Sequence, residues 1–202
     1  MACTHPERVV LACLACVACL ALASCHKRSG APAPAPTPAV GAHLVAATRE
    51  PIKLDGELDE PSWNQLGDPQ TFTQDGQEAR PFSQVRFLHD ADTLYVGLYA
   101  ADQNILSSDK FELTIGTVVI AADPLGHITP AIAGVRAGKD ADGTVDQPGD
   151  QDEEWVIELA IPLAATGWNA GTPLPVRVAR CDTPDDGVVR CGSWSDALRL
   201  SN

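Results

Sequence analysis

Aromatic and basic side chains are scarce in this chain of 202 residues. Phe, Trp and Tyr make up 5% of it, and 14 Lys and Arg stand against 27 Asp and Glu, for a formal net charge of −13 at pH 7. Nucleic-acid binding needs a basic patch that neutralises phosphates, so this charge excludes nucleic acid as a partner. The sequence also lacks a nucleophile elbow, zinc-ligand spacing and a phosphate loop. We therefore expect no enzymatic activity.

Long apolar runs are absent except near the start. Val9–Leu22 follows Arg8, is too short for an ordinary transmembrane helix and has the dimensions of a secretory signal. It ends in Leu22-Ala23-Ser24-Cys25, which resembles the bacterial lipobox, where the cysteine is acylated and becomes the mature N-terminus. We expect residues 1–24 to be a lipoprotein signal peptide and Cys25 to anchor the exported protein in the cell envelope, in the outer membrane. The alternative is a plain signal peptide with an incidental cysteine.

Residues 25–48 are expected to be the acylated N-terminus and a linker. Ser29–Ala42 alternates alanine and proline, a composition that favours polyproline II and gives a semi-rigid spacer of roughly 40 Å. Such a spacer would hold a folded domain clear of a membrane. General disorder is the alternative, and the two interpretations differ only in stiffness.

Cysteine is rare outside the signal peptide. After Cys25, only Cys181 and Cys191 remain. In an oxidising compartment an isolated pair predicts a disulfide rather than a metal site. Asp185-Asp186-Gly187 lies between them and is a good tight-turn sequence, so a hairpin would place the two cysteines opposite each other.

The remaining residues, 49–202, fit a single domain of short strands. In Glu154–Pro162, large apolar side chains alternate with smaller ones and Glu158, so one face is apolar and the other carries a lone carboxylate. Similar alternation recurs around residues 85–87, 94–101, 111–115 and 176–181. Short alternating strands separated by turns predict an all-β fold, an antiparallel β-sandwich.

Three shorter segments have local patterns that predict a strand, a helical turn and a loop. Ile52–Leu54 is expected to be a short strand, and Asp59–Trp63 a helical turn with Pro61 at an early position. Asp140–Asp152 is rich in glycine and acidic residues and is expected to be a loop.

The order of these motifs resembles family 9 carbohydrate-binding modules. The similar segments are Ile52–Trp63, Asp92–Val96, Asp109–Leu113, Trp155–Pro162 and Trp194–Leu200. The resemblance covers about residues 51–200. It implies a β-sandwich, sugar binding and, often, structural calcium.

The chain departs from that family at the sugar site. Sugar-binding members clamp a ring between two indoles, because a pyranose face is apolar and stacks on an aromatic plane. The corresponding segments here, Asn104–Ser108 and Ser195–Ala197, contain no aromatic residue. Glu112 matches a glutamate of the family's binding region, and Trp168 lies in a loop from which it could stack on a ligand. We expect Trp168 and Glu112 to be the ligand-binding residues.

Calcium is the one metal that the sequence leaves open. Asp140 and Asp142 alternate as carboxylate ligands would, but the further ligands of an EF-type loop are missing, and a solvated turn is the alternative. Glu112 and Glu158 would act as an acid–base pair only if they faced one cleft.

Two functions remain. The first is an envelope lipoprotein carrying a non-catalytic module that binds carbohydrate. The second is a structural or protein-interaction sandwich without sugar binding. A pair of aromatic residues on one exposed face favours the first, whereas tryptophans that are all buried favour the second.

Overall fold

The structure, a computed structural model, describes residues 41–147, 149–183 and 187–201. The predicted signal peptide, Cys25 and most of the predicted linker lie outside the described residues. The strands are β1 His43–Ala47, β2 Gln70–Thr71, β3 Thr73–Gln74, β4 Gln77–Glu78, β5 Ser83–His89, β6 Thr93–Ala101, β7 Lys110–Ile115, β8 Val118–Ala122, β9 Ile128–Thr129, β10 Arg136–Asp142, β11 Glu154–Pro162, β12 Leu174–Asp182 and β13 Arg190–Leu200. The helices are α1 Pro61–Gln65 and the 3₁₀ turn η1 Leu163–Thr166.

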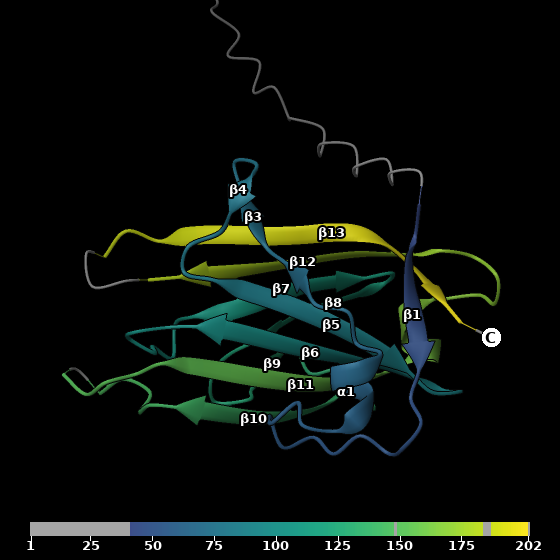
Figure 1. The fold of residues 1–202 in the computed structure, drawn as a ribbon, viewed down its shortest axis with the longest axis horizontal. Coiled ribbons are helices and arrows are strands. Elements are labelled where there is room, and N and C mark those ends of the chain that lie inside the picture. The colour runs from purple at the N-terminus through teal and green to yellow at the C-terminus, as the bar shows by residue number, and fades with distance from the viewer. Residues whose placement is uncertain (1–40, 148, 184–186, 202) are drawn as a thin grey trace, which may run out of the picture. The chain divides into compact units, whose positions relative to one another are not determined.

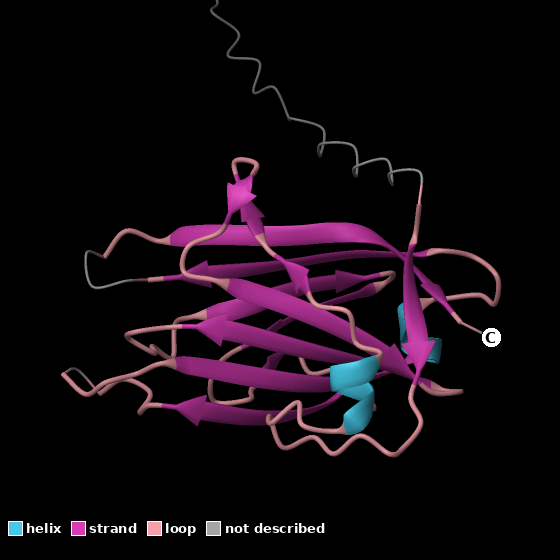
Figure 2. Ribbon diagram, viewed as in Figure 1, coloured by secondary structure: helices cyan, strands magenta, loops and turns pink. Residues whose placement is uncertain are grey.

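The strands form two layers that share β1 (Figures 1 and 2). The first sheet runs β10-β11-β6-β5 and the second runs β13-β12-β7-β8-β9. β1 pairs in parallel with β13 through His43–Val45 and then with β5 through Ala46 and Ala47, so it passes from one sheet to the other. All other pairings among the described strands are antiparallel. The predicted all-β antiparallel sandwich is confirmed.

The main core lies between the sheets. The four large apolar side chains of β11 point inward, and all of them are 0% exposed: Trp155, Ile157, Leu159 and Ile161. They belong to one cluster with the inward side chains of β6 and of β7. The alternation predicted for β11, β6 and β7 is therefore confirmed. The β-branched and aromatic side chains on one face of each strand are removed from water together.

A smaller core covers the outer face of the first sheet. Its buried members are Trp63, Leu88, Tyr95 and Ala160, with half-buried side chains from the segment before α1. This segment crosses β10 so closely at Gly56 that a β-carbon there would run into the backbone of Lys139 and Asp140, and Gly56 also has a φ of 92°. Glycine meets both requirements at that position.

Several local predictions are wrong and others are confirmed. The predicted helical turn with Pro61 at an early position forms α1. Ile52–Leu54 is not a strand: the backbone N–H of Lys53 donates to Glu60 Oε1 at 2.8 Å instead of to a neighbouring strand, while Ile52 and Leu54 pack on the smaller core. The first strand is β1, inside the segment expected to be linker, so the sheet begins before residue 49. Asp140 and Asp142 lie in β10, not in a loop.

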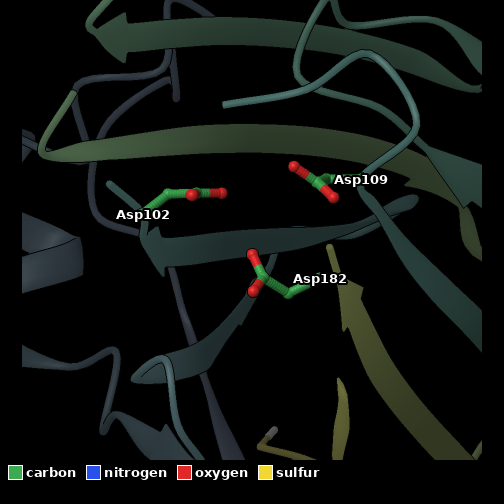
Figure 3. Close-up of side chains that lie close together, drawn as sticks. All are labelled: Asp102, Asp109 and Asp182. Atoms are coloured by element: carbon green, nitrogen blue, oxygen red, sulfur yellow. The ribbon is translucent and has the colours of Figure 1, made fainter. Parts of the chain in front are cut away.

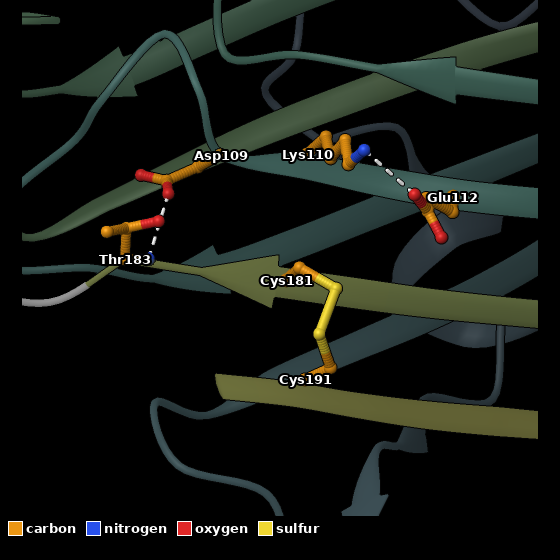
Figure 4. The surroundings of a disulfide bond; sticks show 6 residues. All are labelled: Asp109, Lys110, Glu112, Cys181, Thr183 and Cys191. Atoms are coloured by element: carbon orange, nitrogen blue, oxygen red, sulfur yellow. Dashed lines mark hydrogen bonds and ion pairs between the residues drawn. A yellow bond between two sulfur atoms is a disulfide. The ribbon is translucent and has the colours of Figure 1, made fainter. Parts of the chain in front are cut away.

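Cys181 and Cys191 form the predicted disulfide (Figure 4). They are directly paired residues of β12 and β13, with Cα atoms 4.2 Å apart. The turn residues Asp185 and Asp186 lie outside the described residues. The second sheet is thus cross-linked near the end of β12.

Removing this cross-link should destabilise the fold moderately. We expect the Cys181→Ser, Cys191→Ser double variant to lose about 2–3 kcal/mol of unfolding free energy, because the bridge restricts the unfolded chain. Urea unfolding of both proteins, with and without reductant, measures this. Reductant should weaken the wild-type protein and leave the variant unchanged. Equal stability of the two proteins without reductant would contradict the prediction.

Among the described residues, we find no helix that is both long enough and apolar enough to cross a membrane.

Candidate functional site: a groove at one end of the sandwich

A cavity of about 760 Å³ opens where β6 and β12 end and where β5 and β11 begin. Its lining comes from four separated segments: Arg80–Phe82, Ala101–Asn104, Gln151–Glu153 and Asp182. A second cavity of about 460 Å³ shares Gln103, Asn104 and Asp152 with the first. It adds Leu106, Asp146, Gln147, Gly149 and Asp150. We call the two together the end groove.

The floor of the end groove continues the inward rows of the core strands. Asp102 follows the inward side chains of β6 at the same two-residue spacing. Arg180 and Asp182 extend the inward row of β12, and Asp109 precedes that of β7. The strands therefore place four ionisable side chains where the core meets the groove, and each of them is at most 4% exposed.

Arg180 holds two of these carboxylates together. Its Nη2 donates to Asp102 Oδ2 and to Asp182 Oδ1, both at 2.7 Å. Its Nη1 donates to the carbonyl oxygen of Ala101 at 2.7 Å, and its guanidinium carbon lies 5.8 Å from the centre of the Trp155 ring. Trp155 Nε1 also donates to Asp102 Oδ2, at 3.1 Å. Such charge-assisted hydrogen bonds offset the cost of removing the charges from water.

Asp109 is the third buried carboxylate of this cluster (Figure 3). Its Oδ2 accepts from the backbone N–H of Leu106 at 2.9 Å, and its Oδ1 accepts from that of Thr183 at 3.0 Å. Burial, together with the nearby charge of Asp102, raises the pKa of Asp109 to about 6. Burial likewise raises the pKa of Asp182. One guanidinium faces three carboxylates, so the floor is negative when they are all ionised.

The raised pKa of Asp109 predicts a specific pH dependence. Below pH 4 Asp109 is protonated in both the folded and the unfolded chain, and it adds no difference between them. Between pH 4 and 6 the unfolded chain releases this proton first, so stability falls as the pH rises and stays lower above pH 6. The pKa shift corresponds to at most about 3 kcal/mol, and because the groove admits water we expect about 1–2 kcal/mol.

The Asp109→Asn variant measures this effect because asparagine does not titrate. The wild-type protein should lose about 1–2 kcal/mol relative to the variant between pH 4 and pH 7.5, by chemical denaturation at each pH. Asp146→Asn is the control. A hydrogen bond from the backbone N–H of Ser107 lowers the pKa of Asp146, so its pH dependence has the opposite sign and falls below pH 4. The stability difference between wild type and Asp146→Asn should therefore stay nearly constant from pH 4 to pH 7.5. A pH-independent difference for Asp109→Asn would contradict the assignment.

Phe82 gives the end groove an aromatic wall. Its half-buried ring packs edge-on against Tyr99, with the ring centres 6.1 Å apart. Next to it, Arg80 is exposed and pairs with Glu78 at 2.8 Å. The amide side chains of Gln103 and Asn104 lie on the same lining. The groove thus combines an apolar ring with hydrogen-bonding groups, which is the usual composition of a small-molecule site. No pattern in the sequence distinguishes Phe82 as a binding residue.

The two predicted ligand-binding residues lie elsewhere. Glu112 points outward from β7, where its Oε1 is 2.9 Å from Lys110 Nζ (Figure 4). Trp168 lies between η1 and β12, at the end of the sandwich opposite to the end groove. Its ring is half-buried against the main core, and its Nε1 donates to the carbonyl oxygen of Thr172 at 3.0 Å. The structure does not bring Trp168 and Glu112 together at the groove, and their role in binding stays a prediction.

Glu158 does not share a cleft with Glu112. Glu158 is 0% exposed on the outer face of the first sheet, whereas Glu112 lies on the outer face of the second. Both carboxylate oxygens of Glu158 accept hydrogen bonds, from the backbone N–H groups of Asp55 and Gly56 and from Trp63 Nε1. The condition for an acid–base pair is therefore not met.

The carboxylates offer calcium a poor set of ligands. Asp140 and Asp142 are exposed on β10, and their use as calcium ligands stays a prediction. Within the described part of the chain, the carboxylates that gather as metal ligands would are Asp102, Asp109 and Asp182. Asp102 and Asp182 already direct an oxygen at Arg180 Nη2, at 2.7 Å each. The guanidinium therefore occupies the position that a metal ion would need. This floor therefore fits Arg180 rather than Ca²⁺.

None of the four tryptophans forms an exposed pair. Trp63 and Trp155 are 0% exposed. Trp194 is half-buried and packs on Phe87, with the ring centres 5.4 Å apart. Trp168 packs at the other end of the core, as described above. The double indole clamp is thus missing from the structure as well as from the sequence.

Comparisons with known proteins agree with this architecture. No family model matches the chain, and no curated protein matches it in sequence. A family 9 carbohydrate-binding module from Caldicellulosiruptor kristjanssonii, solved with cellotriose, superposes with a TM-score of 0.61 at 12% identity, over 79% of this chain and 93% of that one. The structure of such a module from the same organism with glucose gives a TM-score of 0.58 at 12% identity, over 78% and 95%. The chain has the fold of these modules.

Proposed function

We propose that this protein is an exported, lipid-anchored protein of the bacterial cell envelope whose β-sandwich binds carbohydrate without catalysing a reaction. The observation that carries the proposal is the end groove on a fold shared with carbohydrate-binding modules. Phe82 offers a ring on which the apolar face of a sugar can stack, and Gln103, Asn104 and Gln151 offer donors and acceptors for its hydroxyl groups. The two similar modules were solved with cellotriose and glucose, so glucans are the first ligands to test.

The carboxylates of the floor support binding rather than catalysis. Asp102 and Asp182 are 4% and 3% exposed and both are hydrogen-bonded to Arg180. A general acid or base must reach the atom whose proton it moves, and these oxygens are directed at the guanidinium instead. Their hydrogen bonds to Arg180 hold the ends of β6 and β12 together beneath the groove.

One observation favours the second function, a structural or protein-interaction sandwich. The tryptophans that would form a clamp all pack into the core or against it, as in a scaffold that has lost its sugar site. A single aromatic wall contributes roughly 1 kcal/mol beyond the area it buries. We therefore expect millimolar affinity for simple sugars at the end groove, and none if the second function is correct.

Two variants, Phe82→Ala and Trp168→Ala, separate the candidate sites. Calorimetric titration of the purified protein with glucose and cellotriose, with and without calcium, should show weak binding that Phe82→Ala abolishes. Trp168→Ala tests the site expected from the sequence and should leave this binding intact. Loss of binding in Trp168→Ala alone would move the site to the opposite end of the sandwich. Absence of any sugar binding in the wild-type protein would favour the second function.

Anchoring makes a separate prediction. Cys25 ends the lipobox-like segment and precedes a proline-rich spacer. Acylated Cys25 should keep the processed protein in the detergent phase with the membranes, whereas Cys25→Ala should give a soluble or unprocessed protein. Phase separation and intact-mass analysis measure both properties. Membrane partitioning of a processed Cys25→Ala protein would rule out the anchor.

A further inference from the structure

The lining of the end groove has a strong excess of negative charge. Across its two cavities it carries six acidic residues and a single basic one, Arg80. The acidic residues are Asp102, Asp146, Asp150, Asp152, Glu153 and Asp182. Arg80 is already paired with Glu78. The guanidinium of Arg180 lies beneath the floor and is shared by two carboxylates. An anionic sugar would therefore be repelled from this groove.

The exposed acids stand at the rim and the buried ones form the floor. Asp150 and Glu153 are exposed, whereas Asp102, Asp152 and Asp182 are at most 5% exposed. Both oxygens of Asp152 are used by the backbone N–H groups of Ile105 and Thr144, at 2.7 Å and 2.9 Å. The rim carboxylates are therefore the ones free to meet a ligand, while the floor supplies a negative field in a partly enclosed space.

Phe82 makes this groove more than an acidic surface. Its ring stands in the same cavity as Asp102, Glu153 and Asp182, with amide side chains beside it. A ligand that matches the whole lining needs an apolar face for the ring, hydroxyl groups for the amides and a positive charge for the carboxylates. A sugar unit with a protonated amine has all three. A metal ion would use only the carboxylates.

We infer that the end groove selects sugars that carry protonated amines, such as glucosamine units, over neutral sugars of the same shape. This inference rests on the proposed carbohydrate binding and adds its ligand class. The ring would stack on Phe82, and the ammonium group would donate charge-assisted hydrogen bonds to Glu153 or Asp150 at the rim. The second cavity extends the groove, so neighbouring units of an oligomer would meet Asp146 and Asp150 in turn.

A matched series of trisaccharides tests this inference. The β-1,4-linked trimers of glucose, N-acetylglucosamine and glucosamine differ only at the second carbon, which bears a hydroxyl, an acetamide or an ammonium group. At pH 6 and low salt we expect the glucosamine trimer to bind the purified protein about tenfold more tightly than the other two. The preference should shrink as salt is added, because screening weakens interactions between exposed charges.

Variants then assign the effect to residues. Glu153→Gln with Asp150→Asn should reduce the preference for the glucosamine trimer over the glucose trimer to about twofold or less. Glu57→Gln, which removes an exposed carboxylate outside the groove, is the matched control and should change nothing. Phe82→Ala should weaken all three trimers.

The binding results distinguish a failure of this inference from a failure of the proposed carbohydrate binding. Equal binding of the three trimers would overturn the inference and leave the proposed function standing. Absence of binding for all three would overturn both. Binding of trilysine as tight as that of the glucosamine trimer, unaffected by Phe82→Ala, would show a site for cationic peptides and overturn the inference for sugars.

Discussion

Replacing Glu158 by alanine is expected to lower the free energy of unfolding by about 3–5 kcal/mol, since the change leaves two buried donors and one part-buried donor without an acceptor. Asp55 and Gly56 donate backbone N–H groups to Oε2 at 2.9 Å and 2.7 Å, and Trp63 Nε1 donates to Oε1 at 3.0 Å. Burial raises the pKa of Glu158, which reflects a desolvation cost that these bonds offset. A loss of this size is a large part of the stability of an ordinary domain.

Glu158→Gln separates the hydrogen bonds from the shape of the side chain. Glutamine keeps one acceptor oxygen but turns an amide group toward a donor, so we expect about half the loss caused by alanine. Glu57 is exposed and follows Gly56 in the chain, and its replacement by alanine should cost less than about 0.5 kcal/mol. Urea unfolding gives the energies, and hydrogen exchange of the Gly56 amide reports the local contact. A Glu158→Ala protein as stable as Glu57→Ala would contradict this role.

Replacing Arg180 by methionine should have a comparable effect at neutral pH. Two carboxylates would lose their shared guanidinium while they stay buried, and breaking a buried ion pair by removing one partner costs about 3–5 kcal/mol. Asp109 nearby adds like charge. Asp109 and Asp182, whose pKa values are raised, take up protons at low pH and reduce the repulsion, so the loss should be smaller at pH 4 than at pH 7.5.

A neutral version of the cluster is the control for Arg180→Met. The triple variant Asp102→Asn, Arg180→Met, Asp182→Asn carries no charge at these three positions and should recover a large part of the lost stability at pH 7.5. Denaturation of the wild-type protein and both variants at the two pH values measures this. A loss that is the same at both pH values and that the triple variant does not reverse would point to packing rather than charge.

Alternation along the strands made most of the fold predictable. In β11 and β6 the apolar faces and the lone carboxylate could be assigned because strand side chains point to opposite faces in turn. The disulfide could be predicted because the predicted export signal and the count of cysteines left a single pair. By contrast, β1 lies in an alanine-rich segment whose pattern is too weak to separate from the linker, and it is held by pairing with strands far away in the sequence.

The end groove was harder to predict because it depends on where separate strands end. Asp102, Asp109, Arg180 and Asp182 continue the inward rows of three strands, and this spacing could have marked them as buried. No local pattern, however, places Phe82 beside Asp182, because that requires the order of the strands in both sheets. The prediction for Trp168 rests on its residue type and its place in a loop, and the connection after β11 carries that loop to the other end.

The most direct test of carbohydrate binding at the end groove is a map of backbone amide shifts by NMR during titration with cellotriose and with the glucosamine trimer. Shifts should concentrate at residues 80–82, 101–104 and 150–153, with larger changes for the glucosamine trimer at equal concentration. Residues around Glu112 and Trp168 should stay unchanged. Shifts confined to the outer face of β7 and the loop after η1, or no saturable shifts with either sugar, would contradict this site.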